Sequence, residues 1–327
     1  MHRMRGRPRR TPVRVELPGR LHSHRQERTA LPSPLSPVTP LSECHPMHSV
    51  VCIKQVPDSA QIRVHPVTNT IMRQGVPAII NPYDLFALEE ALRLKDKFGG
   101  TVTVVTMGPP MAEAALRKCL SFGADDAILV SDRAFAGSDT LATSYALSAV
   151  IRKIMEDMPV DLIFTGKQTI DGDTAQVGPG IAKRLDYQLL TYVSRIVDVD
   201  TAKKEIQVER RAEGGVQLLE TSLPCLITML EGTNEMRFGD LDDLFRAARH
   251  ELKVWDRVAA GIDTVEMIGL KGSPTVVSKV FAPKPRSKRA ELIESHDSDP
   301  KNLAEAALAK LFTQHPNLEQ EIAKRAV

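Results

Sequence analysis

The residues best suited to bind a ligand lie in the stretch GKQTIDGDTAQVGPGIAKRL, residues 166–185, which directly follows the apolar run VDLIFT. Gly166 lets the chain leave a strand tightly, and Gly172 permits close backbone approach or a positive φ. A helix is expected to follow, with Asp173 or Thr174 as its N-cap. Because a helix N-terminus presents free N–H groups and the positive end of the dipole, this stretch predicts a phosphate or nucleotide site.

Two carboxylates complicate that interpretation. Asp171 and Asp173 cannot both face a pyrophosphate, so we expect one to cap the helix and the other to face ribose hydroxyls or solvent. An ordinary β-loop-α connection that uses Gly and Asp for its turns is the alternative. The sequence contains neither GxGxxG nor GxxxxGK[ST], so the standard dinucleotide fingerprint and the P-loop are absent.

Other polar residues carry weaker signals. Lys54 follows an apolar run and is either an anion contact or an exposed lysine. Ser138, Asp139 and Thr140 begin a helical stretch, where such residues cap the helix, contact a ligand, or do both. His65 and His250 lack partners at metal-ligand spacing, so no metal site is expected. The cysteines show no CxxC spacing, and we expect Cys52, Cys119 and Cys225 to be reduced core residues.

The elements that position these residues follow from the apolar pattern after Met47. Short apolar runs alternate with amphipathic helical stretches, and runs such as TVTVVTM are continuously apolar, as in parallel strands covered on both faces. The pattern predicts a doubly wound, mostly parallel α/β sheet of the Rossmann-like, adenine-nucleotide-binding type. In such a sheet ligands bind at the carboxyl ends of the strands. Strands are expected within 49–54, 101–108, 126–132 and 160–166, and helices within 81–99, 109–124, 138–157 and 173–186.

The chain is expected to have three parts. Residues 1–46 are rich in Arg and Pro and predict a disordered extension, either a basic arm or translated sequence upstream of a true start at Met47. Residues 47–260 form the nucleotide-binding domain, with antiparallel edge strands after Leu189 and a helix over 240–255. Residues 261–327 form an extended C-terminal arm and a final helix, which packs on this chain or on a partner.

Composition excludes several classes. The formal net charge of the 327 residues is only +2, which argues against nucleic-acid binding by the folded part. No apolar run reaches membrane-spanning length, so we expect a cytoplasmic protein whose membrane association, if any, comes through a partner.

Several motifs together resemble the β subunit of electron transfer flavoproteins, and specifically its Fix branch. They are VCIKQVPD, NPYDLFALEEALRLKDKFGG, TMGPP, GKQTIDGDTAQVGPGIAKRLD, ERRAEGG and LPCLITMLEGTNEMRF. The resemblance covers about residues 47–283. It implies a heterodimer with an α subunit (FixB-type) that carries its own FAD, and a C-terminal arm on this chain that wraps around that subunit.

The resemblance also implies the ligand and its contacts. In ordinary members the crevice holds AMP, whereas in the Fix branch, which the loop DGDTAQVGP resembles, it holds a second FAD. The implied adenine-nucleotide contacts are Cys52, Asn81, Pro82, Tyr83, Asp84 and Met107. The implied phosphate contacts are Gly166, Lys167, Gln168, Asp171, Gly172, Asp173, Thr174, Gln176 and Val177, and the residues toward the isoalloxazine are Asp139 and Thr140.

The function that the resemblance implies is electron transfer rather than catalysis by the chain's own acids and bases. NADH would reduce the crevice FAD, which would send one electron through the α-subunit flavin to quinone-reductase and ferredoxin-like partners (FixC- and FixX-type). The other electron would go to a low-potential ferredoxin or flavodoxin that serves nitrogen fixation. The alternatives are an AMP-containing β subunit that serves acyl-CoA dehydrogenases, and an ATP-binding stress-protein-like module without a redox role.

Overall fold

The computed structural model describes the following residues: 13–16, 46–58, 63–64, 71–72, 77–276, 292–293, 299–318 and 322. The chain divides into two units, residues 1–280 and 281–327. Most of the N-terminal extension, Cys44, His65 and the segment 277–291 lie outside the described residues, so the expectations for them stay predictions.

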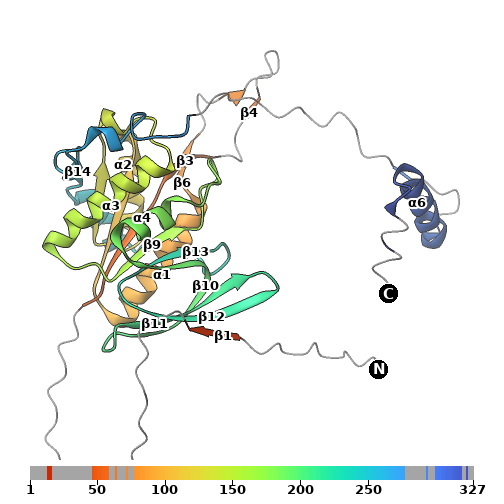
Figure 1. The fold of residues 1–327 in the computed structure, drawn as a ribbon, viewed down its shortest axis with the longest axis horizontal. Helices are drawn as coiled ribbons and strands as arrows, with labels where there is room; N and C mark the ends of the chain where they lie inside the picture. Colours follow the sequence, from red (N-terminus) through yellow and green to blue (C-terminus); the bar gives the residue numbers. More distant parts are fainter. Residues whose placement is uncertain are drawn as a thin grey trace, which may run out of the picture. The chain divides into compact units, whose positions relative to one another are not determined.

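A ten-stranded sheet forms the centre of the first unit (Figure 1). Its parallel part has the order β13-β9-β2-β7-β8-β14. Burial along β13, β9 and β2, and along most of β7 and β8, explains their apolar sequences, whereas the last strand, β14, is largely exposed. This arrangement confirms the predicted α/β class. The strands are β2 (His48–Cys52), β7 (Thr101–Met107), β8 (Asp126–Val130), β9 (Leu162–Gly166), β13 (Cys225–Met229) and β14 (Lys253–Trp255).

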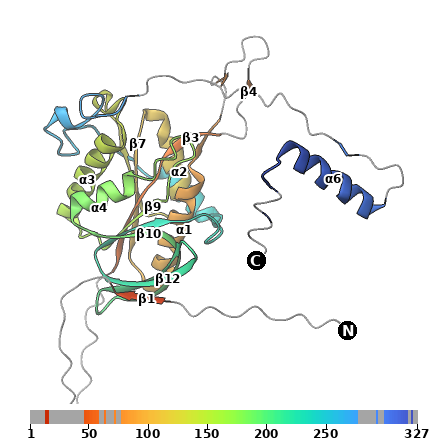
Figure 2. The ribbon, with the colours of Figure 1, turned by 45° about the vertical axis from the view of Figure 1, so that its right-hand side comes forward.

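Helices cover both faces of the parallel strands, so the unit has three layers (Figures 1 and 2). One apolar core lies between the sheet and α1 (Pro82–Phe98), α2 (Glu113–Ser121) and α5 (Leu241–Arg249). A second core lies between the other face and α3 (Thr140–Asp157) and α4 (Val177–Leu185). Burial of Cys52, Cys119 and Cys225 in these cores confirms the prediction for the cysteines.

The helix starts follow the sequence signals closely in two cases. Pro82 opens α1, and Gly99, at φ 74°, ends it where a residue with a Cβ would be strained. The Asp139 carboxylate accepts hydrogen bonds from the N–H groups of Leu141 and Ala142 at 2.9 and 3.1 Å, so Asp139 is the N-cap of α3.

The antiparallel extension is formed by β10 (Gln188–Asp200), β11 (Glu205–Ala212) and β12 (Gly215–Ser222), as predicted for the region after Leu189. The expectation that the last strand of this region is also antiparallel is wrong. β13 is parallel to both β9 and β10 and lies between them, because its uniformly apolar CLITM fits a position covered on both faces. Strand β1 (Val13–Glu16) pairs with β12, an element not expected in the N-terminal extension.

Short elements complete the first unit. Two small hairpin sheets pair β3 (Gln55–Pro57) with β6 (Ala78–Ile80), and β4 (Arg63–Val64) with β5 (Ile71–Met72). Three 3₁₀ turns span Pro110–Ala112, Arg133–Phe135 and Val265–Met267. The sequence pattern predicted none of these hairpins.

The region after residue 240 differs from the prediction in two respects. The helix predicted over 240–255 ends at Arg249, because His250 takes an extended conformation and the chain continues into β14. Residues 261–276 belong to the first unit, where Ile262, Ile268 and Ser273 are buried, so the compact part extends past Gly261. In the second unit, α6 (Pro300–Gln314) confirms the predicted final helix, with Asp299 as its N-cap.

Helices α2 and α5 are joined by reciprocal arginine contacts. Arg246 on α5 donates to the carbonyl oxygens of Leu120 and Ala124 at 3.1 and 2.7 Å, at the end of α2. Arg117 on α2 donates to the carbonyl oxygens of Ala247 and His250 at 3.1 and 3.3 Å, at the end of α5. Each arginine therefore satisfies carbonyls that the other helix leaves without an intrahelical donor.

Candidate functional site

The strand order places the switch point of the sheet between β2 and β9. From β2 the chain moves outward through β7 and β8, and it then returns to the other side of β2 to form β9 and β13. In open parallel sheets the crevice for a ligand lies at the carboxyl ends of the two strands flanking such a reversal. The exits of β2 and β9 are therefore the candidate site.

Asn81 connects the two exits from a fully buried position. Its backbone N–H donates to the Lys54 carbonyl oxygen at 2.8 Å. Its side-chain amide donates to the Gln168 carbonyl at 2.9 Å and accepts from the Ile170 N–H at 3.2 Å. Because both ends of the amide are used inside the protein, Asn81 shapes the crevice wall rather than offering its amide to a base or ribose.

Asp84 lies beside Asn81 and is only 4% exposed. Its carboxylate accepts the Lys54 N–H at 2.7 Å and the Gly166 N–H at 3.1 Å, so one side chain holds the exits of both strands. Burial raises the pKa of Asp84 to about 7, although the hydrogen bonds from Asn81, Lys54 and Gly166 act in the opposite direction. A Cβ on Gly166 would lie 2.5 Å from an Asp84 oxygen, so this close approach requires glycine.

The loop 167–176 leads from β9 to α4 and differs from the prediction at its end. The helix begins only at Val177, its N-cap is Gln176, and no side chain caps it. The expectation that Asp173 or Thr174 is the cap is therefore wrong. Asp173 and Ala175 have positive φ values of 52° and 55°, which turn the chain before the helix starts. Of the two alternatives for Gly172, a positive φ is not observed, but the backbone does approach closely, since a Cβ there would lie 3.3 Å from the Thr169 hydroxyl oxygen.

The two carboxylates of the loop have separate partners. Asp171 accepts two hydrogen bonds from the Lys54 ammonium group, at 2.7 and 2.9 Å, which join the exits of β9 and β2. Partial burial alone would raise the pKa of Asp171, but the hydrogen bonds from Lys54 and Thr169 outweigh it and lower the pKa. Asp173 accepts from the Gln168 side-chain amide at 2.8 Å. Neither carboxylate points freely into the crevice, which removes the conflict between two like charges and a phosphate.

The start of α4 has the features that a phosphate requires. Pro179 has no N–H and Gly180 donates to the Gln176 carbonyl at 2.9 Å, so with no side-chain cap the N–H groups of Val177 and Gly178 lack intrahelical acceptors and lie at the positive end of the dipole. The Thr165 hydroxyl, on a residue that is 6% exposed, has no hydrogen-bond partner among the described residues. A Cβ on Gly178 would lie 2.8 Å from that hydroxyl oxygen, so the helix backbone approaches Thr165 directly. A nucleotide phosphate here would use groups that otherwise remain without partners.

The start of α3 joins the same crevice. Thr140 donates from its hydroxyl to the Gln176 side-chain oxygen at 2.8 Å, which connects α3 to the residue before α4. Asp139 also accepts from the Thr275 N–H and hydroxyl at 3.1 and 2.7 Å. Burial opposes ionisation of Asp139, but its hydrogen bonds from Ala142, Thr275 and Leu141 lower its pKa below the ordinary value.

Comparison with known proteins shows the family to which the chain belongs. The family model for the electron transfer flavoprotein domain matches residues 68–260. Protein FixA of Azorhizobium caulinodans is 62% identical over 281 residues, which cover 86% of this chain and 99% of that protein. The chain belongs to the electron transfer flavoprotein family.

Further relatives place the chain within this family. The electron transfer flavoprotein subunit beta of Clostridium acetobutylicum is 44% identical over 270 residues, covering 82% of this chain and 99% of that protein. The caffeyl-CoA reductase-Etf complex subunit CarD of Acetobacterium woodii is 45% identical over 238 residues, covering 72% and 88%. The chain is thus an electron transfer flavoprotein β subunit of the FixA type, which confirms the resemblance. Membership implies binding of a flavin, AMP or both, and an α subunit as partner.

The flavoprotein fold brings most of the predicted residues to the two strand exits or to the helix starts beside them. Cys52 ends β2 in the core, where burial raises the pKa of its thiol to about 12, so only its backbone remains available to a ligand. Met107 ends β7, and Tyr83 lies under the Lys167 ammonium group at 4.9 Å from its ring. The half-buried or exposed predicted residues are Pro82, Tyr83, Met107, Asp139, Thr140, Lys167, Gln168, Asp171, Gly172, Asp173, Thr174, Gln176 and Val177.

The sequence analysis did not assign functions to three residues of this region. Thr165 was treated only as part of an apolar strand, and nothing in its type marks a hydroxyl without a partner. Lys54 was considered as an anion contact, but its ion pair with Asp171 depends on the strand order. Thr275 belongs to a GSPT motif near the chain's end, and its hydrogen bonds to Asp139 span 136 residues.

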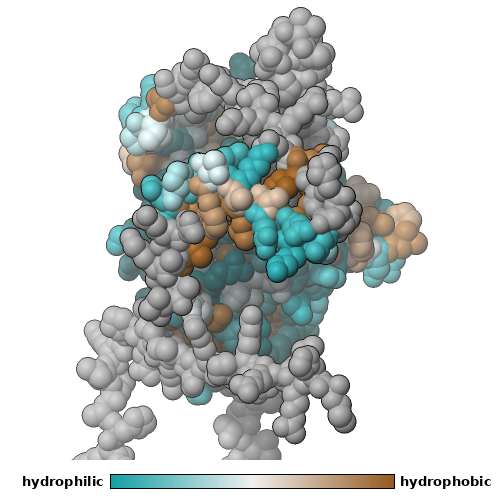
Figure 3. Space-filling view, turned by 90° about the vertical axis from the view of Figure 1, so that its right-hand side faces the viewer, coloured by the Kyte–Doolittle hydropathy of each residue, from teal (hydrophilic) through white to brown (hydrophobic). Residues whose placement is uncertain are grey.

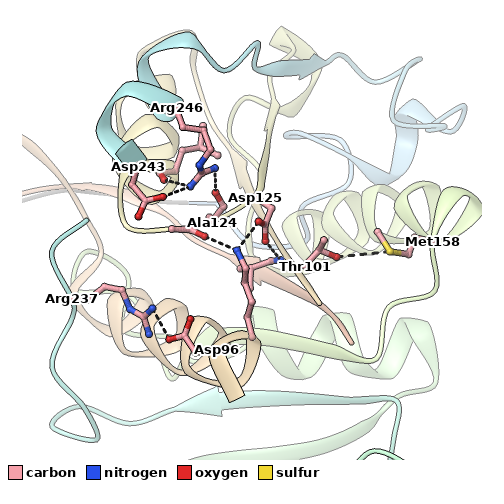
Figure 4. Close-up of polar contacts among 12 residues, drawn as sticks. Asp96, Thr101, Ala124, Asp125, Met158, Arg237, Asp243 and Arg246 are labelled. Carbon is pink, nitrogen blue, oxygen red and sulfur yellow. Dashed lines mark hydrogen bonds and ion pairs between the residues drawn. The ribbon is translucent and has the colours of Figure 1, made fainter. Parts of the chain in front are cut away.

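A second polar cluster lies away from the crevice, between α1, α2 and α5, around a cavity of about 220 Å³ (Figure 4). Arg237 pairs with Asp96 at 2.8 Å and with the buried Glu89 at 3.0 Å, and Arg246 pairs with Asp243 at 2.8 Å. Lys95 pairs with Asp125 at 2.6 Å. Because every cation of the cluster already has an anionic partner, the cluster anchors α5 and is not an anion site.

Among the described residues, no group of three or more His, Cys, Asp and Glu side chains has an arrangement that could hold a metal ion. None of the described helices is long and apolar enough to cross a membrane. The face shown in Figure 3 carries hydrophobic side chains among hydrophilic ones.

Proposed function

We propose that this chain is the β subunit of a bifurcating electron transfer flavoprotein and that its crevice binds FAD. In this proposal electrons from NADH pass through the crevice FAD to the α-subunit flavin and to a low-potential ferredoxin or flavodoxin for nitrogen fixation. The observation that carries the proposal is the start of α4, where an uncapped helix end lies beside the buried Thr165 hydroxyl that has no partner. The identity to proteins named FixA supports the Fix branch.

The chain's own residues would bind and orient the dinucleotide. The N–H groups of Val177 and Gly178 at the start of α4 and the Thr165 hydroxyl would donate to the phosphates, while Lys54 stays paired with Asp171. Asp139 and Thr140 would lie on the isoalloxazine side. FAD, when bound, supplies the hydride and single-electron chemistry, for which the protein provides geometry and electrostatics.

The proposed partners follow from the same assignment. The α subunit (FixB-type) would contact the arm and helix α6, whose Leu308 and Leu311 are exposed on the described second unit. Quinone-reductase and ferredoxin-like proteins (FixC- and FixX-type) would receive electrons, and any membrane association of this cytoplasmic chain would come through them.

Counting the bound nucleotides tests the proposal. The complex with its α subunit is purified under native conditions, denatured, and analysed for FAD and AMP by liquid chromatography. Two FAD and no AMP per heterodimer is the expected result. One FAD and one AMP would show instead the AMP-containing type, which the same uncapped helix end could serve because AMP also carries a phosphate. A complex without flavin would exclude both and leave an ATP-binding module without a redox role.

A further inference from the structure

Asp84 was expected from the sequence to contact the ligand, but its surroundings give it another role. Both carboxylate oxygens are occupied inside the protein: one accepts the Lys54 N–H at 2.7 Å, and the other accepts the Gly166 N–H at 3.1 Å. The residue is only 4% exposed. A group with both oxygens engaged behind the crevice wall acts on a ligand only through the backbone that it holds.

The two N–H groups that Asp84 binds belong to the two strands that form the crevice. Lys54 follows β2, and Gly166 ends β9, the neighbouring parallel strand. One side chain therefore accepts a backbone N–H from each side of the switch point. The spacing between the two strand exits depends on a group that can accept a hydrogen bond on each of its two oxygens. The backbone at Gly166 packs so closely that no side chain fits there, because a Cβ would lie 2.5 Å from an Asp84 oxygen and 2.6 Å from the Tyr83 side chain.

Few ionisable groups face Asp84. Cys52 and Lys54 lie at the end of β2, and Cys119 lies on α2. Lys167, which follows β9, forms an ion pair with Glu231 at 3.0 Å. Burial raises the thiol pKa values of Cys52 and Cys119, so both stay protonated at neutral pH. Lys54 is paired with Asp171 on the crevice side. Asp84, whose pKa is raised to about 7 by burial, is therefore the group here that changes charge near neutrality.

Protonation changes the hydrogen bonding of Asp84 directly. An ionised carboxylate offers acceptors on both oxygens, whereas a carboxylic acid has one oxygen that carries a proton and donates. Asn81 also donates to this carboxylate, but the two strand exits use different oxygens: Lys54 N–H bonds to one and Gly166 N–H to the other. When Asp84 takes a proton from solvent, the protonated oxygen presents a hydrogen to the N–H group that it accepted, so the exit of β2 or of β9 is no longer held.

We propose that Asp84 is a positioning residue whose ionised carboxylate holds the exits of β2 and β9 at the spacing that a nucleotide requires, and whose protonation releases the nucleotide. This inference rests on the proposed function, because it concerns retention of a ligand in the same crevice. It makes nucleotide retention pH-dependent without any titratable group in contact with the nucleotide.

The size of the effect follows from one ionisation. With a midpoint near pH 7, about nine-tenths of the carboxylates are ionised at pH 8 and about one-tenth at pH 6. If the nucleotide binds only the ionised form, its dissociation constant rises about tenfold between these pH values.

The test uses the full-length chain in complex with its α subunit. FAD and AMP that remain after gel filtration at pH 6 and pH 8 are quantified, and dissociation constants for added FAD and AMP are measured at both pH values. The variants are Asp84→Asn, which cannot accept on both atoms, and Asp161→Asn as matched control. Asp161 accepts the His48 N–H at 3.0 Å and so holds the opposite end of the same strand, β2. Hydrogen exchange of the Lys54 and Gly166 amides, corrected for the intrinsic effect of pH, is followed in the same samples.

We expect the wild-type complex and Asp161→Asn to bind the crevice nucleotide about tenfold more weakly at pH 6 than at pH 8. Asp84→Asn should bind weakly at both pH values, with no pH dependence. A flat wild-type profile, or an Asp84→Asn variant that keeps the wild-type profile, would overturn the inference. If neither FAD nor AMP binds at any pH, the proposed function fails. Hydrogen exchange of the Lys54 and Gly166 amides then tests by itself whether Asp84 holds the two strand exits. Protection of the two amides that is lost toward pH 6 and absent in Asp84→Asn supports it, whereas unchanged protection overturns it.

Discussion

Thr165 shows how a single residue can be costly in the free protein and useful in the complex. Its buried hydroxyl has no partner among the described residues, and leaving such a group unsatisfied costs ~1–3 kcal/mol. The adjacent start of α4 is uncapped. One phosphate could accept hydrogen bonds from both the Thr165 hydroxyl and the N–H groups at the start of α4. These two observations are therefore the main support for the proposed site.

Replacement of Thr165 by valine, which has the same shape, tests this reasoning. We expect Thr165→Val to keep or raise the stability of the ligand-free protein, since it removes a polar group without a partner, and to weaken nucleotide binding about tenfold or more. Thermal unfolding and titration with FAD and AMP measure the two effects. Thr264→Val is the control, because Thr264 is exposed, its side chain caps no helix, and it is not among the predicted nucleotide contacts. A loss of stability in Thr165→Val with unchanged binding would contradict the assignment.

Asp84 also predicts how stability depends on pH. Its pKa is raised from 3.8 to about 7 in the folded chain, so between these values the folded state binds more protons than the unfolded state. Stability from this group is therefore highest below about pH 4 and decreases as pH rises to about 7. In the ligand-free complex, the melting temperature of the wild type should fall relative to that of Asp84→Asn as the pH is raised from 5 to 8. Parallel profiles for the two proteins would show that Asp84 does not titrate in this range.

At the scale of elements, the sequence predicted the helices and parallel strands better than the loops. Continuous apolar runs such as TVTVVTM, and end signals such as Asn81-Pro82 and Gly99, act locally, and β7 and α1 are formed where predicted. The start of α4 was predicted four residues too early, because Asp173 and Ala175 take left-handed conformations that residues with a Cβ seldom adopt. The place of β13 in the sheet also required the tertiary structure, since an apolar run does not specify its neighbours.

The segment that leads into α5 is held to α1 by a buried charge pair. Arg237 binds both oxygens of Glu89, whose side chain is 7% exposed. We expect Arg237→Ala to destabilise the protein by about 2–3 kcal/mol, because Glu89 would lose its partner in the interior. Arg93→Ala is the matched control: Arg93 is 56% exposed and pairs with Glu90 at 3.5 Å, so its loss should cost less than about 1 kcal/mol. Urea unfolding measures both, and equal effects would contradict this role for Glu89.

At the scale of the whole molecule, the fold class was predictable from the sequence, but the contacts at the candidate site were not. Alternating strands and helices predict a ligand site at the strand ends, and the strand order puts the switch point between β2 and β9. The contacts that shape it, such as Lys54 with Asp171 and Asp139 with Thr275, join residues more than a hundred positions apart. Their types are common on any surface, and only the topology brings them together.

The N-terminal extension contributes little to the folded unit according to the described residues. Strand β1 pairs only with the edge strand β12, and 281 residues of this chain match 99% of the FixA protein of A. caulinodans. We expect a chain that starts at Met47 to fold with its free energy of unfolding within ~1 kcal/mol of the full-length value. Urea unfolding of both forms measures this. A loss of several kcal/mol would show that residues 1–46 belong to the folded core.

The reciprocal arginines of α2 and α5 have a dynamic consequence. Arg117 and Arg246 each hold the terminal carbonyls of the other helix, so neither helix can fray at its end without releasing the arginine that secures its neighbour. The last turns of both helices should open as one cooperative unit, and their amides should share a single opening rate in exchange measurements.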